Sequence, residues 1–155
     1  MFKSLAFDLA FRYLLHQLDT DGDGKYTACD KEEKIKIFGH SWGGISAVKL
    51  AREIKSSVKF QGKEVAIVAV IDPVSRLRVG PTSVPSNVQR FWNRYQTHGE
   101  GVTIGGRPVH GRRLRCYAQS GCDDQIDLNP GPNDNLIDHW TIIDTVRSEL
   151  VNMLE

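Results

Sequence analysis

Ser41 lies in a run of glycines whose spacing is typical of a serine nucleophile. The stretch Gly39-His40-Ser41-Trp42-Gly43 has the pattern G-x-S-x-G, and a further glycine follows it. An apolar segment precedes the pattern and a helix-forming segment follows it, which is the strand-turn-helix context that such a serine requires. We expect a strained backbone at Ser41, with glycines where side chains would collide with neighbouring backbone. The helix N-terminus and the backbone N–H of Trp42 would then stabilise a developing oxyanion.

A nucleophilic serine needs a base, and the base needs an acid that orients it. Asp72 follows an apolar segment directly, at the carboxyl end of a predicted strand, where the sites of open parallel sheets lie. His139 follows a polar loop and precedes the last predicted helix. We expect His139 to be the general base. The other histidines fit this role less well, because they lie on the first predicted helix, inside the turn or in glycine-rich loops: His16, His40, His98 and His110.

A second stretch with recognisable chemistry is the acidic loop over residues 19–30, DTDGDGKYTACD. It matches a calcium-binding loop, which has carboxylates at positions 1, 3 and 5, a glycine at position 6 and an acid at position 12. An aspartate at position 12 reaches less far than the usual glutamate. A solvated acidic turn is the alternative interpretation. The expected ligands are carboxylates, one backbone carbonyl at Lys25 and one threonine that binds directly or through water: Asp19, Asp21, Asp23, Lys25, Thr27 and Asp30.

The neighbours of this loop favour a structural ion over a calcium sensor. A helix is predicted before the loop, but a strand is predicted soon after it, at residues 34–38. The sequence therefore predicts no second helix that calcium could swing open. A bound Ca²⁺ would instead pin the first helix to the strand that leads to Ser41.

The elements that must position these residues follow from the spacing of apolar side chains. Apolar residues between positions 7 and 18 recur at helical spacing and predict a first helix. KIKIF at 34–38 and EVAIVAVI at 64–71 predict strands, and the second is apolar on both faces, as a central parallel strand must be. GISAVKLAREIK at 44–55 predicts a helix between them. Together they form a βαβ unit, for which a right-handed crossover is expected.

The second half of the chain is less regular. Residues 73–106 are predicted to be mostly loop, except for NVQRFWNRYQ at 87–96, which predicts a short helix. RRLRCYAQ at 112–119 predicts another strand, and residues 140–154 predict a closing amphipathic helix. The loops are suited to form the rim of a site.

Composition excludes several classes of function. The 155 residues are enough for one domain, over 1–155, and the net charge of +1 provides no field that would attract nucleic acid. No apolar run is long enough to span a bilayer, and Asp8 and Arg12 interrupt the apolar N-terminal stretch, which we interpret as a mature helix rather than a signal peptide. Cys116 and Cys122 could close a small disulfide loop, with free thiols as the alternative. The calcium loop and such a disulfide would favour an extracytoplasmic or secreted protein.

IFGHSWGG, VAVIDPV and DHWTI, in this order along the chain, resemble the serine, acid and histidine motifs of the α/β-hydrolase superfamily. The resemblance implies an α/β fold with a mostly parallel sheet flanked by helices. It implies Ser41 as the nucleophile, His139 as the general base and Asp72 as its orienting acid. Because many members carry the acid one strand later, three other residues stay open for that role: Asp123, Asp124 and Asp138.

The resemblance extends over residues 1–155 but maps onto only the later part of the hydrolase fold. Members have several strands before the nucleophile strand, including one whose following loop donates the second oxyanion N–H. The chain would then be a fragment or a minimal version, or a sheet that a second copy or a partner chain completes, because strand 34–38 is left with an open edge.

The expected function is the hydrolysis of carboxylic esters, either small-molecule or lipid esters, through an acyl-enzyme. Thioesters and amides are open to the same chemistry. The alternative from another class is a non-catalytic calcium-binding or interaction domain built on the same scaffold.

Overall fold

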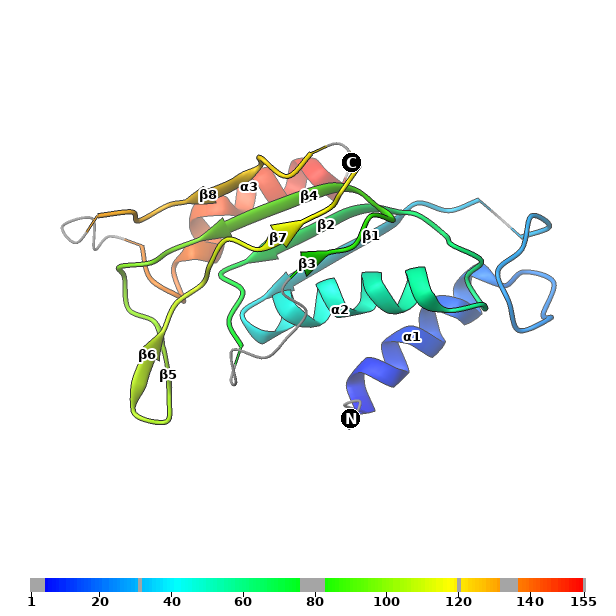
Figure 1. Cartoon of the computed structure of the whole chain (residues 1–155), viewed down its shortest axis with the longest axis horizontal. Helices are drawn as coiled ribbons and strands as arrows, with labels where there is room; N and C mark the ends of the chain where they lie inside the picture. The colour runs from blue at the N-terminus through cyan, green and yellow to red at the C-terminus, as the bar shows by residue number, and fades with distance from the viewer. Residues whose placement is uncertain (1–4, 31, 76–82, 120, 132–136, 155) are drawn as a thin grey trace.

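The computed structural model describes residues 5–30, 32–75, 83–119, 121–131 and 137–154. Its centre is a four-stranded sheet in the order β1-β2-β4-β8, in which every neighbouring pair is parallel. Figure 1 shows these strands side by side. Their bounds are Ile35–His40 for β1, Val65–Ile71 for β2, Val88–Tyr95 for β4 and Gln125–Asp127 for β8.

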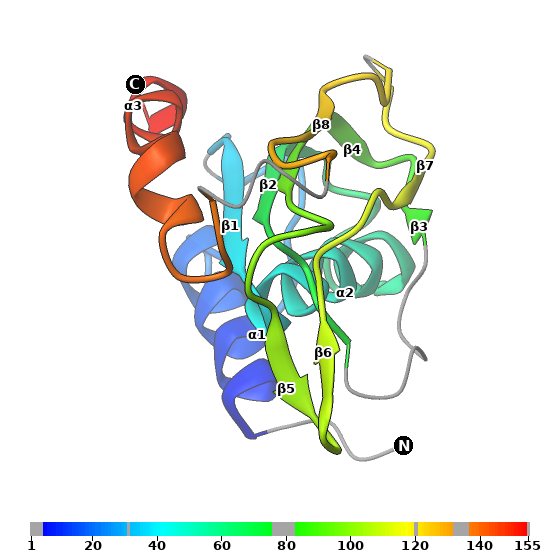
Figure 2. The ribbon, with the colours of Figure 1, turned by 90° about the vertical axis from the view of Figure 1, so that its left-hand side faces the viewer.

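Helices cover both faces of this sheet. Helices α1 (Leu5–Leu18) and α2 (Trp42–Ser56) lie on one side, and α3 (Ile142–Leu154) lies on the other (Figures 1 and 2). The predicted βαβ unit is confirmed as β1, α2 and β2, and the first and last predicted helices are confirmed as α1 and α3. The architecture is therefore a parallel sheet flanked by helices. None of the helices in the described ranges is long and apolar enough to cross a membrane.

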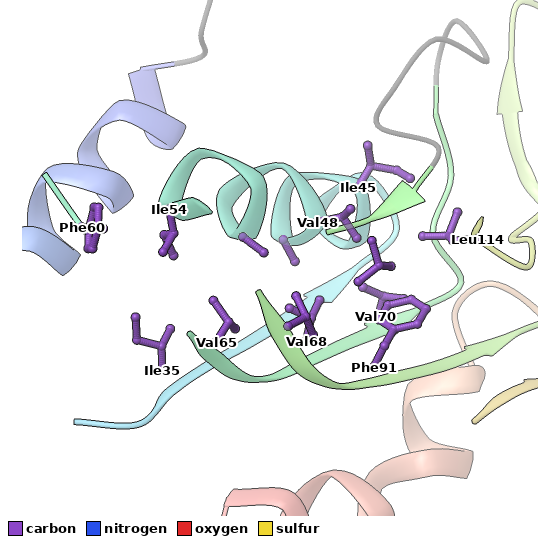
Figure 3. Packing of buried hydrophobic residues seen from close by; sticks show 14 of the residues in the cluster. Ile35, Ile45, Val48, Ile54, Phe60, Val65, Val68, Val70, Phe91 and Leu114 are labelled. Atoms are coloured by element: carbon purple, nitrogen blue, oxygen red, sulfur yellow. The ribbon is translucent and has the colours of Figure 1, made fainter. Parts of the chain in front are cut away.

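Strand β2 is buried on both faces, as its apolar sequence predicts. Val68 and Val70 belong to the cluster under α2, whereas Ala69 and Ile71 belong to the cluster under α3. Figure 3 shows the α2 side, where Val48 on the helix faces Val68 on the strand. Because successive side chains of a strand point to opposite faces, β2 joins the two halves of the core. The core on both faces of β2 consequently holds the carboxyl end of this strand in place.

The predicted helix at 87–96 is wrong, because this segment forms strand β4. Phe91 and Trp92 fill opposite faces of the sheet, and Asn93 and Arg94 are also buried. The Arg94 guanidinium is paired with Asp124 at 2.8 Å and with Glu149 at 2.7 Å. These partners are distant in sequence, so the polar residues looked like the exposed face of a helix although they are buried in a strand.

The segment after β4 contains a hairpin that the apolar spacing did not predict. Strands β5 (Val102–Ile104) and β6 (Arg107–Val109) pair antiparallel and project from the carboxyl end of the sheet (Figure 1). Gly105 and Gly106 join them with φ of 59° and 75°, values that suit a two-residue hairpin turn. The dipeptide Gly-Gly was the available signal.

The strand expected at 112–119 is reduced to β7 (Arg115–Cys116), which pairs parallel with β3 (Ser83–Val84). Cys116 forms a disulfide with Cys122, and this decides between the two alternatives that the sequence left open. Cys29 is a free, exposed thiol.

The turn from β1 to α2 needs glycine at some of its positions but not at all of them. A Cβ at Gly39 would collide with the backbone of Gly43, and one at Gly44 would come within 3.1 Å of Pro73. A Cβ at Gly43 would meet nothing within 4 Å, so the expected collision is absent there. Ser41 itself has a φ of 58° and a ψ of −126°, which is the strained backbone expected of it.

Gly39→Ala and Gly43→Ala form a matched pair that tests this turn. We expect Gly39→Ala to lower the free energy of unfolding by about 1–3 kcal/mol, because backbone must shift to admit the methyl group. Gly43→Ala should cost nothing, or add up to about 1 kcal/mol, because alanine is the better helix former. Urea unfolding followed by circular dichroism measures both. Equal free energies of unfolding for the two variants would contradict this description of the turn.

Candidate active site

Ser41 is held at the junction of β1 and α2 by its backbone. Its N–H donates to the carbonyl of Ile71 at 2.9 Å, and its carbonyl accepts from Gly44 at 3.1 Å and Val74 at 3.3 Å. Ser41 occupies the N-cap position of α2, yet its side chain makes no capping hydrogen bond. A serine at this position usually uses its hydroxyl as a cap. Here the partly buried hydroxyl is left available for other chemistry.

Asp72 lies beside Ser41 at the same edge of the sheet. His40 pairs in register with Ile71, so the residues that follow them leave adjacent strand ends. Asp72 is fully buried and has a φ of 42°, unusual for a residue with a side chain. Its Oδ1 accepts from the backbone N–H of Gly111 at 2.9 Å and of Gln96 at 3.2 Å. These two backbone hydrogen bonds therefore fix the Asp72 carboxylate independently of any histidine.

His139 completes a buried pair with this carboxylate. Its Nδ1 lies 2.5 Å from Asp72 Oδ2, and the imidazole is only 1% exposed. Because a carboxylate can only accept, Nδ1 carries the proton, and a neutral imidazole then has its lone pair on Nε2. The backbone of His139 is held on both sides, since its N–H donates to Glu100 at 2.9 Å and its carbonyl accepts from His40 Nε2 at 3.0 Å. Nε2 is thus prepared to accept a proton.

His40 packs against His139 without competing for that role. The two ring centroids are 4.6 Å apart. Burial lowers the pKa of His40, which favours its neutral form beside His139. Its Nε2 must carry a proton, because the carbonyl of His139 accepts from it. A neutral neighbour leaves room for a positive charge on His139 during a reaction.

The three other acids that the sequence left open have different partners. Asp138 accepts from the backbone N–H of Trp140 and of Thr141, both at 2.8 Å, in the turn before α3. The N–H of Thr141 is the main cause of the lowered pKa of Asp138. Asp124 pairs with Arg94, and Asp123 is exposed with Arg113 at 3.9 Å. Among these four acids, Asp72 is the one that is hydrogen-bonded to His139.

The structure brings together the acid and the histidine more closely than the histidine and the serine. Among the residues that the structure describes, no hydrogen bond joins Ser41 to His139. Trp42 is the first residue of α2, as the oxyanion hypothesis requires, and 43% of the residue is exposed. The arrangement thus pairs His139 with a carboxylate at the end of β2, and Ser41 lies at the neighbouring strand end.

Two residues that hold Asp72 were not found by the sequence analysis. Gln96 uses both its backbone N–H and its side chain, whose Nε2 lies 3.3 Å from Asp72 Oδ2. Gly111 approaches so closely that a Cβ there would collide with the Asp72 side chain. Both act largely through the backbone, so residue type gave little signal. The only signal in the sequence was Gly111 itself, an isolated glycine in a loop, and nothing in the sequence indicated why that position needs glycine.

In the acidic loop, three of the predicted ligands converge. Asp19, Asp21 and Asp23 each offer a carboxylate oxygen within 4.8 Å of the others. Asp19 also accepts from the backbone N–H groups of Gly22 at 2.7 Å and Gly24 at 2.8 Å, which shapes the loop around the three carboxylates. Converging oxygens of this kind fit a hard cation such as Ca²⁺.

The other predicted ligands lie differently. Asp30 is outside the converging group, because its Oδ1 accepts from Thr20 and its Oδ2 from Thr27, both through backbone N–H groups at 2.6 Å. The Thr27 N–H is the main cause of the lowered pKa of Asp30. The N–H of Lys25 donates to Asp23 at 2.7 Å. In this arrangement Asp30 closes the loop by hydrogen bonds rather than by facing the other carboxylates.

No protein-family model, curated protein or solved structure matches this chain. Function must therefore be inferred from the geometry of the site itself. That geometry consists of a buried His139–Asp72 pair and a serine in a strained turn at the adjacent strand end.

Proposed function

We propose that the protein is a serine hydrolase of the α/β-hydrolase type that cleaves carboxylic esters. The observation that carries the proposal is the fully buried hydrogen bond between His139 Nδ1 and Asp72 Oδ2, next to Ser41. Burying an ionisable pair is costly, so its position beside a strained serine favours a catalytic role over a structural one.

The proposed reaction uses these three side chains in sequence. Ser41 Oγ attacks the acyl carbon while its proton passes to His139 Nε2, and Asp72 stabilises the resulting imidazolium. The tetrahedral intermediate collapses, and the imidazolium gives its proton to the departing alcohol. Water then attacks the acyl-enzyme with His139 as base, which releases the carboxylic acid and restores Ser41. The backbone N–H of Trp42, at the start of α2, would stabilise the oxyanion.

The same chemistry would serve thioesters or amides, and the shape of the site does not separate these acyl donors. A non-catalytic binding domain is the second candidate function. It is favoured by the lack of a hydrogen bond between Ser41 and His139 among the described residues. Within the described ranges β1 pairs with β2 alone, and its other edge is where a second copy or a partner chain would complete the sheet.

Ester hydrolysis by active-site variants tests the proposed function. With 4-nitrophenyl butyrate, we expect Ser41→Ala and His139→Ala each to lower kcat/KM by about 10³-fold or more, because each removes a group that acts in the transition state. Ser56→Ala, an exposed serine at the far end of α2, is the matched control and should retain the wild-type rate. Equal rates for wild type and Ser41→Ala would favour the binding domain.

We also propose that the acidic loop holds a structural Ca²⁺ through Asp19, Asp21 and Asp23. The ion would relieve the repulsion between three carboxylates that lie close together. Position 12 contributes differently from the loop template, because Asp30 lies outside the group of converging carboxylates and accepts from Thr20 and Thr27 instead. The proposed ion would stabilise the connection between α1 and β1 and take no part in proton transfer.

Thermal unfolding with calcium and with a chelator tests this ion site. At a calcium concentration about 100 times Kd, we expect the Tm to rise by about 5–10 °C, because only the folded loop binds. Asp21→Ala should lose most of this rise. Glu32→Gln, an exposed acid outside the loop, should keep it. An identical Tm in calcium and in chelator would contradict a calcium site.

A further inference from the structure

A cavity of about 540 Å³ lies beside the candidate active site. One wall is formed by Pro73 and Ser75, in the segment that follows Asp72, and the other by the hairpin of β5 and β6 with the residues after it. The first wall contacts the serine turn directly, because the N–H of Val74 donates to the Ser41 carbonyl at 3.3 Å. The second wall is tied to the acid through Gly111, whose N–H donates to Asp72 Oδ1. Both walls of the cavity are therefore tied by hydrogen bonds from backbone N–H groups to residues of the candidate site.

The lining of the cavity is cationic. Arg107 and Arg112 both face it, together with His110, and no carboxylate is among its described lining residues. Nη2 of Arg112 is buried and has no hydrogen-bond partner among the described residues. Guanidinium groups are always charged, and leaving one of their N–H groups buried and unpaired is costly. Because Arg112 also lines the cavity, it adds a permanent positive charge to the cavity wall.

Arg112 differs from the arginines around it. Arg94 is buried but has two carboxylate partners, and Arg113 is exposed near Asp123. Arg112 has its backbone fixed instead, because its carbonyl accepts from Asn93 Nδ2 at 3.0 Å and the preceding Gly111 is bound to Asp72. Arg112 therefore lines the cavity from a fixed backbone, and among the described residues no carboxylate pairs with its guanidinium, so its charge can attract an anion.

We propose that this cavity binds an anionic group of the substrate, so that the preferred substrates are esters that carry a carboxylate or a phosphate. Arg112 supplies the central contact and Arg107 adds positive charge at the rim. The identity of the substrate rests on the proposed hydrolase function, whereas binding of the anion does not. The shared chemistry is an oxyanion that the planar guanidinium can bind through two hydrogen bonds.

Substrate selectivity gives the first test. Mono-4-nitrophenyl glutarate and 4-nitrophenyl pentanoate have acyl chains of equal carbon number, and only the first ends in a carboxylate. We expect wild type to prefer the anionic ester and Arg112→Ala to lower the ratio of the two kcat/KM values by about 10- to 100-fold, the loss of a charge-assisted hydrogen bond. Arg112→Lys should restore only part of the ratio, and Arg113→Ala, the matched control, should leave it unchanged. Equal ratios in wild type and in both Arg112 variants would overturn the proposal.

The second test measures anion binding without turnover, as a change in the Tm of the Ser41→Ala protein. Millimolar glutarate or inorganic phosphate should raise its Tm, the two ligands distinguishing a carboxylate from a phosphate site, and the rise should be lost when Arg112→Ala is added. A rise that depends on Arg112, together with a wild-type protein that hydrolyses neither ester, would overturn the proposed function and keep the anion site. Ester hydrolysis with no rise from either anion would overturn the anion site and keep the hydrolase.

Discussion

The buried hydrogen bond between Asp72 and His139 is the interaction on which the candidate site depends. Both side chains are almost completely excluded from solvent, and removing one partner of such a pair typically costs about 3–5 kcal/mol because the other charge stays buried. The pair brings together segments that are far apart in sequence: the end of β2, Gln96 after β4, Gly111, and the turn before α3. Every one of these segments must be in place before Asp72 and His139 can form their hydrogen bond.

Backbone strain gathers at the same point. Ser41 and Asp72 both have positive φ, a conformation that costs on the order of 1–3 kcal/mol each when it is not over-determined by the surroundings. Here the register between β1 and β2 and the close approach of Gly39 to Gly43 determine it. The core of β2, buried from both faces, supplies the rigidity that keeps both residues at the sheet edge. A stable parallel sheet thus supports the strained turn that the proposed chemistry requires.

The sequence predicted the elements that a local pattern of residues defines. It did not predict those that depend on contacts between residues far apart in the chain. The runs that became β1, α2 and β2 carry their own periodicity, and the glycines around Ser41 indicate the turn without further context. β4 was mistaken for a helix because the partners of Asn93 Nδ2 and of the Arg94 guanidinium are distant in sequence: Arg112, Asp124 and Glu149. The sequence favoured Asp72 as the acid and left three alternatives open, and the hydrogen bond to His139 now separates Asp72 from them. The cationic cavity could not be predicted, because its walls come from segments that only the fold places together.

Covalent labelling by a fluorophosphonate reports whether Ser41 is activated by the His139–Asp72 pair. In that reaction Ser41 Oγ would form a bond to phosphorus, fluoride would leave, and His139 would take the hydroxyl proton, so the reagent reports on an activated serine whatever the natural substrate is. The account predicts one equivalent of label on the peptide that contains Ser41, with labelling slowed by about 10³-fold or more in Asp72→Asn, because the histidine then loses its orienting carboxylate. No label on Ser41 in the folded protein, or equal labelling of wild type and Asp72→Asn, would contradict it.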